Sequence, residues 1–190
     1  MKNILFAIVC FAFISSCGRG SGDSTPPEAL PPATQIGANT AGCLINGNLL
    51  LPKNGSQAIG GSPQFGLKAS FVYDYFYMDL KNYDSGVYLY LYVDNVNING
   101  IGAYTINQSD GIASPNGIKN NTQVYVESGG KIFISGNNAG VVNITRYNFP
   151  IISGNFSATL YNKYNALETI EITDGRFDIN KNTINTTNFP

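Results

Sequence analysis

Between residues 40 and 180, apolar residues recur at alternate positions in short runs that are separated by turn-forming residues. Alternation of this kind is typical of β-strands with one buried face, because successive strand side chains point to opposite sides. No window after residue 40 sustains the 3.6-residue periodicity of an amphipathic helix. We therefore expect strands at 43–45, 49–51, 67–73, 75–81, 87–93, 103–107, 123–127, 131–135, 141–147, 153–161, 169–173 and 176–179.

Turn-forming dipeptides separate these runs. Asn46-Gly47 is a strong two-residue hairpin signal, and residues 82–86 also favour a turn. Many short strands with tight turns predict an all-β domain over residues 41–180, an antiparallel β-sandwich or flattened barrel of about 8–10 short strands. Residues 181–190 are rich in Asn and Thr, and we expect this tail to fray. The other predicted turns are Asn99-Gly100, Asn116-Gly117, Gly129-Gly130, Gly136-Asn137 and Asp174-Gly175.

The first sixteen residues differ from the rest of the chain. Lys2 precedes an apolar run over residues 4–14 that is too short to span a bilayer, followed by Ser15 and Ser16. This pattern predicts a secretory signal peptide. Ile14-Ser15-Ser16-Cys17 resembles the lipobox of bacterial lipoproteins, which implies that residues 1–16 are removed and that Cys17 carries lipid. Gly18 after this cysteine, in place of Asp, resembles the outer-membrane sorting signal.

The composition of residues 17–40 predicts a tether between the lipid anchor and the folded body. A Gly/Ser-rich half is followed by Pro26-Pro27 and Pro31-Pro32, so the first part is flexible and the second is stiffened toward polyproline II. We expect that the folded body can stand off the membrane, but no farther than this tether reaches.

The amino-acid composition argues against several classes of function. The chain of 190 residues has a net charge of −1 and contains no basic run, which argues against nucleic-acid binding. It contains no His, which excludes Ser-His-Asp catalysis and imidazole-based zinc sites. Cys10 leaves with the signal peptide and Cys17 carries lipid, so Cys43 stays unpaired; its apolar neighbours predict a buried, inert thiol.

Two ends of the body carry a family resemblance. The motifs are Pro31-Pro32-Ala33-Thr34-Gln35, Gly37, Asn39-Thr40, Gly42-Cys43-Leu44-Ile45-Asn46-Gly47, Ile152-Ser153-Gly154, Phe156 and Thr173-Asp174-Gly175-Arg176-Phe177-Asp178. In these motifs the chain resembles a family of uncharacterised Gram-negative envelope lipoproteins, catalogued as a domain of unknown function. The resemblance implies a lipoprotein with an all-β body and brings no activity and no site residues.

Tyrosines alternate with aliphatic residues in two neighbouring predicted strands. Strand geometry places the tyrosines of each strand on one face, and a register that opposes Tyr77 to Tyr88 would form a cross-strand ladder. Such a face can stack on sugars or peptides, or it can be partly covered by loops and serve only the strands. The candidate ligand-binding residues are Tyr73, Tyr75, Tyr77, Tyr88, Tyr90 and Tyr92.

Three other patterns favour plain structural roles. Residues 95–100 mimic half of a calcium loop but lack the closing carboxylate, and Val96 and Ile98 look inward-facing, so we expect a polar turn. Residues 128–131 have the Ser-x-x-Lys spacing but lie between two strands, which predicts a hairpin turn. The pairs Asp79/Asp84 and Asp174/Asp178 could serve as glycosidase carboxylates, but Asp84 and Asp174 are at turn positions.

These patterns together predict a lipid-anchored protein of the outer membrane that is not an enzyme and has no cofactor or metal site. The first hypothesis is a binding module for a glycan, a peptide or an envelope protein. The alternatives are a lipocalin-like carrier of a small apolar ligand inside a closed barrel, and a structural component of an envelope assembly.

Overall fold

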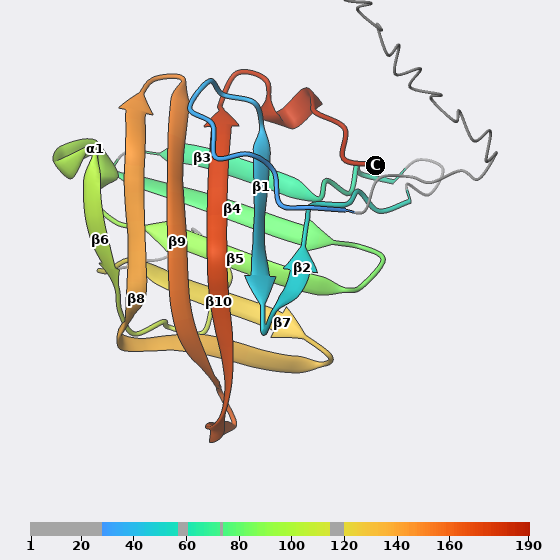
Figure 1. Ribbon diagram of the computed structural model, residues 1–190, viewed down its shortest axis with the longest axis vertical. Coiled ribbons are helices and arrows are strands. Elements are labelled where there is room, and N and C mark those ends of the chain that lie inside the picture. Colours follow the sequence, from blue (N-terminus) through green and yellow to red (C-terminus); the bar gives the residue numbers. More distant parts are fainter. Residues whose placement is uncertain (1–27, 57–60, 73, 115–119) are drawn as a thin grey trace, which may run out of the picture.

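The computed structural model describes residues 28–56, 61–72, 74–114 and 120–190. Ten strands form one antiparallel sheet that curls into a half-barrel (Figure 1), so the all-β prediction is confirmed. Cys17 and the tether up to Pro27 lie outside the described residues. The elements are β1 (Thr40–Ile45), β2 (Asn48–Leu50), β3 (Leu67–Val72), β4 (Tyr75–Asn82), β5 (Val87–Val93), α1 (Val96–Asn99), β6 (Gly102–Ile106), β7 (Gln123–Ser128), β8 (Lys131–Asn148), β9 (Ile151–Asn162), β10 (Asn165–Asn180) and η1 (Ile184–Thr186).

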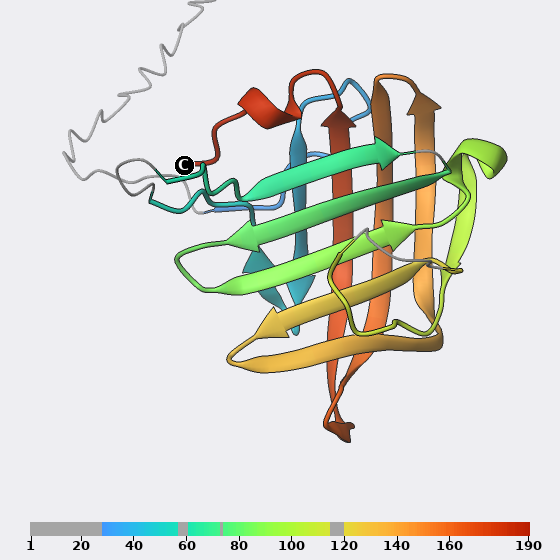
Figure 2. The same ribbon diagram turned by 180° about the vertical axis from the view of Figure 1, so that it is seen from behind.

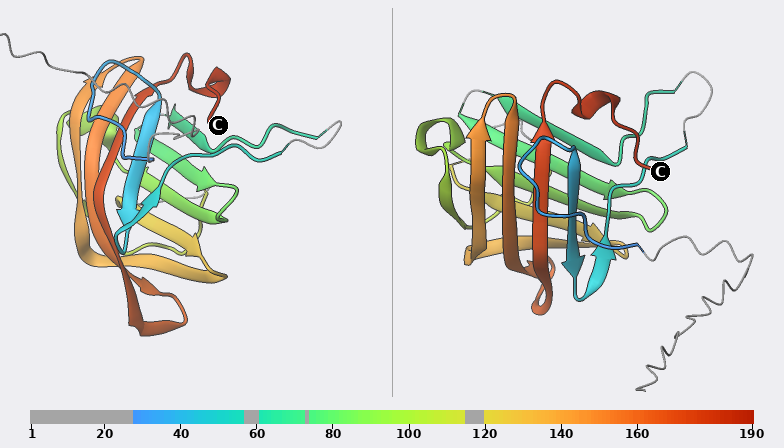
Figure 3. Two further views of the ribbon diagram at one scale, coloured as in Figure 1. Left: turned by 45° about the vertical axis from the view of Figure 1, so that its right-hand side comes forward. Right: turned by 45° about the horizontal axis from the view of Figure 1, so that its top comes forward.

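The curled sheet forms two layers whose strands cross (Figures 1 and 2). One layer holds β6, the second half of β8, β9, β10, β1 and β2; the other holds β3, β4, β5, β7 and the first half of β8. β8 belongs to both layers, because Ile134 pairs with Tyr125 of β7 whereas Val142 pairs with Tyr104 of β6. Figure 3 shows the layers from the side, with β8 turning the corner between them.

Irregular residues interrupt the strand pairing inside β8 and β10. The β8–β9 register shifts between Ser135 and Gly140, and a Cβ on Gly140 would lie 2.0 Å from the Ser157 carbonyl oxygen. The β9–β10 register shifts between Ile172 and Gly175, where Asp174 has φ 53°. The predicted turns at Gly136-Asn137 and Asp174-Gly175 are therefore β-bulges within long strands. The two turn predictions are therefore wrong, because β-bulges and turns favour the same residues and the local sequence does not distinguish them.

Apolar side chains from both layers fill the space between them. Phe177 of β10 stacks on Phe76 of β4 at 5.2 Å between ring centroids and lies 6.4 Å from Phe156 of β9. Cys43 is fully buried in the same core, and burial raises the pKa of its thiol to about 12. The predicted burial of this cysteine is thus confirmed, and its inertness stays a prediction.

Two predicted hairpins form as the turn residues indicated. Asn46 and Gly47 have φ 48° and 77°, and Ile45 pairs with Asn48 across them. Gly129 and Gly130 have φ 58° and 74° between β7 and β8. Ser128 and Lys131 thus form a hairpin turn, as expected.

Two local predictions are wrong. Residues 96–99 form the single-turn helix α1, in which Val96 is buried but Ile98 is 70% exposed, so only one of these residues faces inward. The tail after Asn180 does not fray in the structure. It contains η1 and buries Ile184 and Phe189 in the main core, because these two side chains find apolar partners at the end of the half-barrel.

The chain enters the body through a strap (residues 34–39) that is fastened to the end of β10. The buried Asp178 carboxylate accepts hydrogen bonds from Thr34 Oγ1 (2.6 Å), from Ser153 Oγ (2.7 Å) and from three strap amides. Those amides belong to Ile36, Gly37 and Ala38, at 3.0, 2.8 and 3.1 Å. Burial opposes ionisation of Asp178, but these hydrogen bonds outweigh it and lower its pKa.

Candidate functional site: the tyrosine face

The outer surface of β4, β5 and β7 carries tyrosines at alternate positions, as strand geometry requires. We call this surface the tyrosine face; it consists of Tyr75, Tyr77, Tyr88, Tyr90, Tyr92 and Tyr125. Tyr77 pairs with Tyr92, and Tyr88 pairs with Lys81, so the supposed Tyr77–Tyr88 register is wrong by four residues along β5. Asn82 pairs with Val87, so the centre of the β4–β5 turn lies two residues later in the chain than that register placed it. Tyr73 lies outside the described residues.

The rings nevertheless form cross-strand contacts. The centroids of Tyr75 and Tyr92 are 5.0 Å apart, and those of Tyr77 and Tyr90 are 6.2 Å apart. Tyr125 of β7, which sequence reasoning did not include, meets Tyr88 edge-on at 6.2 Å. Each pair contributes roughly 0.2–1 kcal/mol to the sheet.

A loop covers one part of this face. The described residues after β6 cross the outside of β5 and β7 (Figure 2), and Ala113 packs against the tyrosines. The Asp110 amide donates to Gln123 Oε1 at 2.9 Å and ties this loop to β7. Tyr90 and Tyr92 are therefore only 1% and 3% exposed, whereas the other described candidates, Tyr75, Tyr77 and Tyr88, are half-buried.

The covered tyrosines stay neutral. Burial raises the pKa of Tyr90, and the nearby Asp79 carboxylate raises it further. Burial and then Asp94 do the same for the pKa of Tyr92. Tyr90 and Tyr92 therefore present neutral phenol groups at physiological pH.

The uncovered end of the face holds a half-buried carboxylate, that of Asp79. Tyr88 donates to Asp79 Oδ1 at 2.5 Å across the β4–β5 pair. Burial raises the pKa of Asp79, while the Tyr88 hydroxyl and the positive charge of Lys68 oppose that rise. Asp79 thus has one donor from β5 and one favourable charge from β3.

A pocket of about 180 Å³ opens at this end. The Lys81 ammonium lies 4.4 Å from the centroid of the Tyr83 ring and 6.0 Å from that of Tyr88. Neither Lys68 nor Lys81 has an ion pair among the described residues of the body. Sequence reasoning missed Lys68, Lys81 and Tyr83, although Lys81 continues the alternation of Tyr77 and Asp79. The pocket is lined by Phe65, Lys68, Asp79, Lys81, Tyr83 and Tyr88.

A second hollow lies between the two layers, where the β1–β2 and β7–β8 hairpins approach each other. Its volume is about 380 Å³, and apolar side chains such as Leu50, Val87 and Phe133 line it together with Lys131 and Glu168. This hollow is open to solvent at one end of the half-barrel. The centre beyond it is filled by core side chains.

The carboxylates of the two proposed pairs differ in their surroundings. Asp84 pairs with Lys53 at 2.8 Å, whereas Asp79 is bound by Tyr88. Asp174 is exposed at a bulge, and Asp178 is used up by its donors from the strap and Ser153. Within residues 28–56, 61–72, 74–114 and 120–190, no group of three metal-ligating His, Cys, Asp or Glu side chains occurs.

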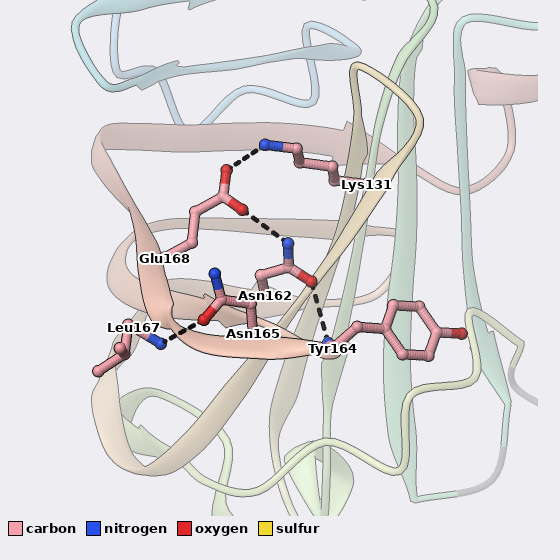
Figure 4. Close-up of polar contacts among 6 residues, drawn as sticks. All are labelled: Lys131, Asn162, Tyr164, Asn165, Leu167 and Glu168. Carbon is pink, nitrogen blue, oxygen red and sulfur yellow. Dashed lines mark hydrogen bonds and ion pairs between the residues drawn. The ribbon is translucent and has the colours of Figure 1, made fainter.

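The β9–β10 hairpin projects from the opposite end of the body to the strap. Glu168 accepts from Lys131 at 2.5 Å and from Asn162 Nδ2 at 2.8 Å (Figure 4). Asn162 Oδ1 also accepts from the Tyr164 amide at 3.0 Å. The hairpin holds Tyr164 79% exposed, with the Lys163 ammonium 6.0 Å from its ring centroid, and so repeats a Lys–Tyr contact outside the pocket lining.

Comparisons of the chain with protein-family models, with curated proteins and with solved structures find no match. Among the described residues, no helix has the length and apolar character needed to cross a bilayer. The tyrosine face and its pocket therefore have to be interpreted from their own geometry.

Proposed function

We propose that this protein is a lipid-anchored, non-catalytic binding module of the bacterial outer membrane, and that it binds an extended polar ligand at the open end of the tyrosine face. The observation that supports this most is the pocket around Tyr83 and Tyr88, which combines aromatic rings with Asp79 and two lysines. Rings provide apolar stacking surfaces, and the charged groups provide hydrogen bonds with direction.

The size of the pocket favours one class of ligand. Sites that enclose a small molecule usually measure about 300–1,000 Å³. A pocket of about 180 Å³ has room for one ring or one side chain, with the rest of the ligand lying along the sheet. A glycan chain fits this description best, because one sugar ring can stack on Tyr83 while its hydroxyl groups reach Asp79 and Lys68.

The anchor is proposed from the Ile14-Ser15-Ser16-Cys17 signal. A Cys17→Ala variant should lose acylation and leave the membrane fraction. Normal processing and firm membrane attachment of that variant would contradict the anchor.

The binding proposal is tested with a matched pair of double variants. Lys81→Ala/Tyr83→Ala removes the Lys–Tyr contact at the pocket, and Lys163→Ala/Tyr164→Ala removes the similar contact on the β9–β10 hairpin. In co-sedimentation with purified peptidoglycan and with lipopolysaccharide, we expect only the first pair to weaken binding, by about 3- to 10-fold for lost stacking. Equal binding by both variants would exclude the pocket.

A second candidate function is favoured by the 380 Å³ hollow between the hairpins, whose volume lies in the range of small-molecule sites. In this alternative the protein carries a small apolar ligand between its layers. Native mass spectrometry of detergent-free protein without residues 1–17 distinguishes the two, because a carrier should retain a co-purifying small molecule.

A further inference from the structure

Several large apolar side chains are exposed at the end of the body where the strap is fastened. Ile36 is 72% exposed in the strap, and Phe149 is 69% exposed in the β8–β9 turn. Ile98 and Ile101, at α1 and just before β6, are 70% and 64% exposed. Isolated exposed apolar residues are ordinary, but several at one end of a small protein indicate a contact surface.

These residues come from separate segments that meet at this end (Figure 1). A hollow of about 180 Å³ joins Asn97 of α1 to Phe149 and Lys181, and so connects the helix to the β8–β9 turn. A Cβ on Gly37 would lie 3.0 Å from Ile151 Cγ1, which places the strap against the start of β9. We call this surface the apolar tip; it consists of Ile36, Ile98, Ile101 and Phe149.

Charged groups of both signs lie around the tip. The Lys181 ammonium lies 5.7 Å from the Phe149 ring centroid and donates to the Phe71 carbonyl at 2.9 Å. Tyr147 lines the same hollow as Phe149, and its pKa is raised first by burial and then by the charge of Asp74. Positive and negative charges therefore both occur near the tip, and its contact surface is apolar.

We propose that the apolar tip docks into the surface of the lipid bilayer that holds the anchor. Phe149 and Ile36 would lie at the boundary between the lipid headgroups and the acyl chains. This inference rests on the proposed lipid anchor at Cys17. Eleven residue steps separate Cys17 from Glu28, where the described chain begins, and they span at most about 40 Å. Glu28 lies beside Lys53, Asn82 and Pro190, and residues 28–33 connect it to the strap that carries Ile36. This short connection keeps the body, and with it the tip, within reach of the bilayer at a high effective concentration.

The other projecting end is a poorer candidate for this contact. The β9–β10 hairpin exposes Tyr164 and Leu167, but Glu168, Asn162 and Asn165 surround them with polar groups (Figure 4). Docking through the apolar tip leaves both this hairpin and the tyrosine face in the aqueous space, where a glycan can reach the pocket.

The chain contains no Trp, so a single introduced Trp reports its own surroundings. Phe149→Trp and Tyr164→Trp are made in the full acylated protein and reconstituted into phosphatidylcholine vesicles that contain brominated lipid. The emission of Phe149→Trp should shift to the blue and be quenched by the brominated chains, at low and at high salt. Tyr164→Trp should be unaffected by brominated lipid and be quenched by acrylamide.

The outcomes separate this inference from its premise. Protein that does not float with vesicles refutes both the anchor and the docking. Protein that floats, but in which Phe149→Trp stays open to acrylamide or Tyr164→Trp is the residue quenched by lipid, refutes the docking alone. Glycan binding at the pocket is measured separately and is not decided by either result.

Discussion

Replacing Asp178 by Asn should loosen the strap and destabilise the whole domain. Asp178 is 1% exposed, and its two carboxylate oxygens accept from three strap amides and from two hydroxyl groups. Hydroxyl groups can rotate to accept from the new amide nitrogen, but backbone N–H groups cannot. If the nitrogen of Asn replaces Oδ1, the Gly37 amide loses its acceptor; if it replaces Oδ2, the amides of Ile36 and Ala38 lose theirs.

The size of the effect follows from these two arrangements. A buried donor without an acceptor costs about 1–3 kcal/mol, and the hydrogen bonds that remain lose their charge assistance. We expect Asp178→Asn to lower the free energy of unfolding by about 2–4 kcal/mol, which corresponds to about 5–15 °C in melting temperature for a domain of this size. Urea unfolding of the chain without residues 1–17, followed by circular dichroism, measures this.

Asp174→Asn is the matched control on the same strand. Asp174 is exposed and 3.9 Å from Arg176, and Asn tolerates its positive φ of 53°, so its replacement should change stability by less than about 0.5 kcal/mol. An Asp178→Asn protein as stable as this control would refute the role given to the strap.

The pH dependence of the free energy of unfolding provides a second test of the role of Asp178. The folded state lowers the pKa of Asp178 below its ordinary value of 3.8. The stability that it contributes is therefore complete above that ordinary value and is lost as the pH falls through the folded pKa. The difference between wild type and Asp178→Asn should be constant near neutral pH and should shrink in strong acid. A difference that grows on acidification would contradict the sign of the pKa shift.

Three further outcomes are expected. Gly140→Ala should cost about 3 kcal/mol, because its Cβ would meet the Ser157 carbonyl at 2.0 Å, whereas Gly136→Ala, 3.3 Å from the movable Tyr161 ring, should cost much less in the same unfolding assay. Phe189→Ala should cost about 2–4 kcal/mol because Phe189 is buried, and Phe149→Ala, which is exposed, should be close to neutral; equal effects would contradict the packed tail. Cys43 should resist a thiol reagent at pH 8 until the protein unfolds, and rapid labelling of the native protein would contradict its burial.

The sequence predicted the features that depend on neighbouring residues. Alternation placed the tyrosines of β4 and β5 on one face, and Asn46-Gly47 and Gly129-Gly130 marked two hairpins. It failed where one local signal has two outcomes. Asp174-Gly175 can end a strand or form a bulge inside it, and only the pairing of β10 with β9 on both sides of the bulge decides between them.

The sequence predicted only part of the candidate site, because long-range contacts decide the rest. Tyr75, Tyr77 and Tyr88 followed from alternation, but the loop that buries Tyr90 and Tyr92 depends on long-range contacts such as Asp110 with Gln123. The pocket requires Lys68 of β3 to lie beside Asp79 of β4. A single strand pattern contains no register between strands, so it could not have shown this pocket.

The central claim is that a ligand binds at the open end of the tyrosine face. Amide chemical shifts of isotope-labelled protein without residues 1–17, titrated with soluble peptidoglycan fragments and with lipopolysaccharide oligosaccharide, test it most directly. We predict that the largest changes occur at Lys68, Asp79, Lys81, Tyr83 and Tyr88 and that they saturate together. Changes that cluster instead at Leu50, Val87 and Phe133, or on the β9–β10 hairpin, would contradict it.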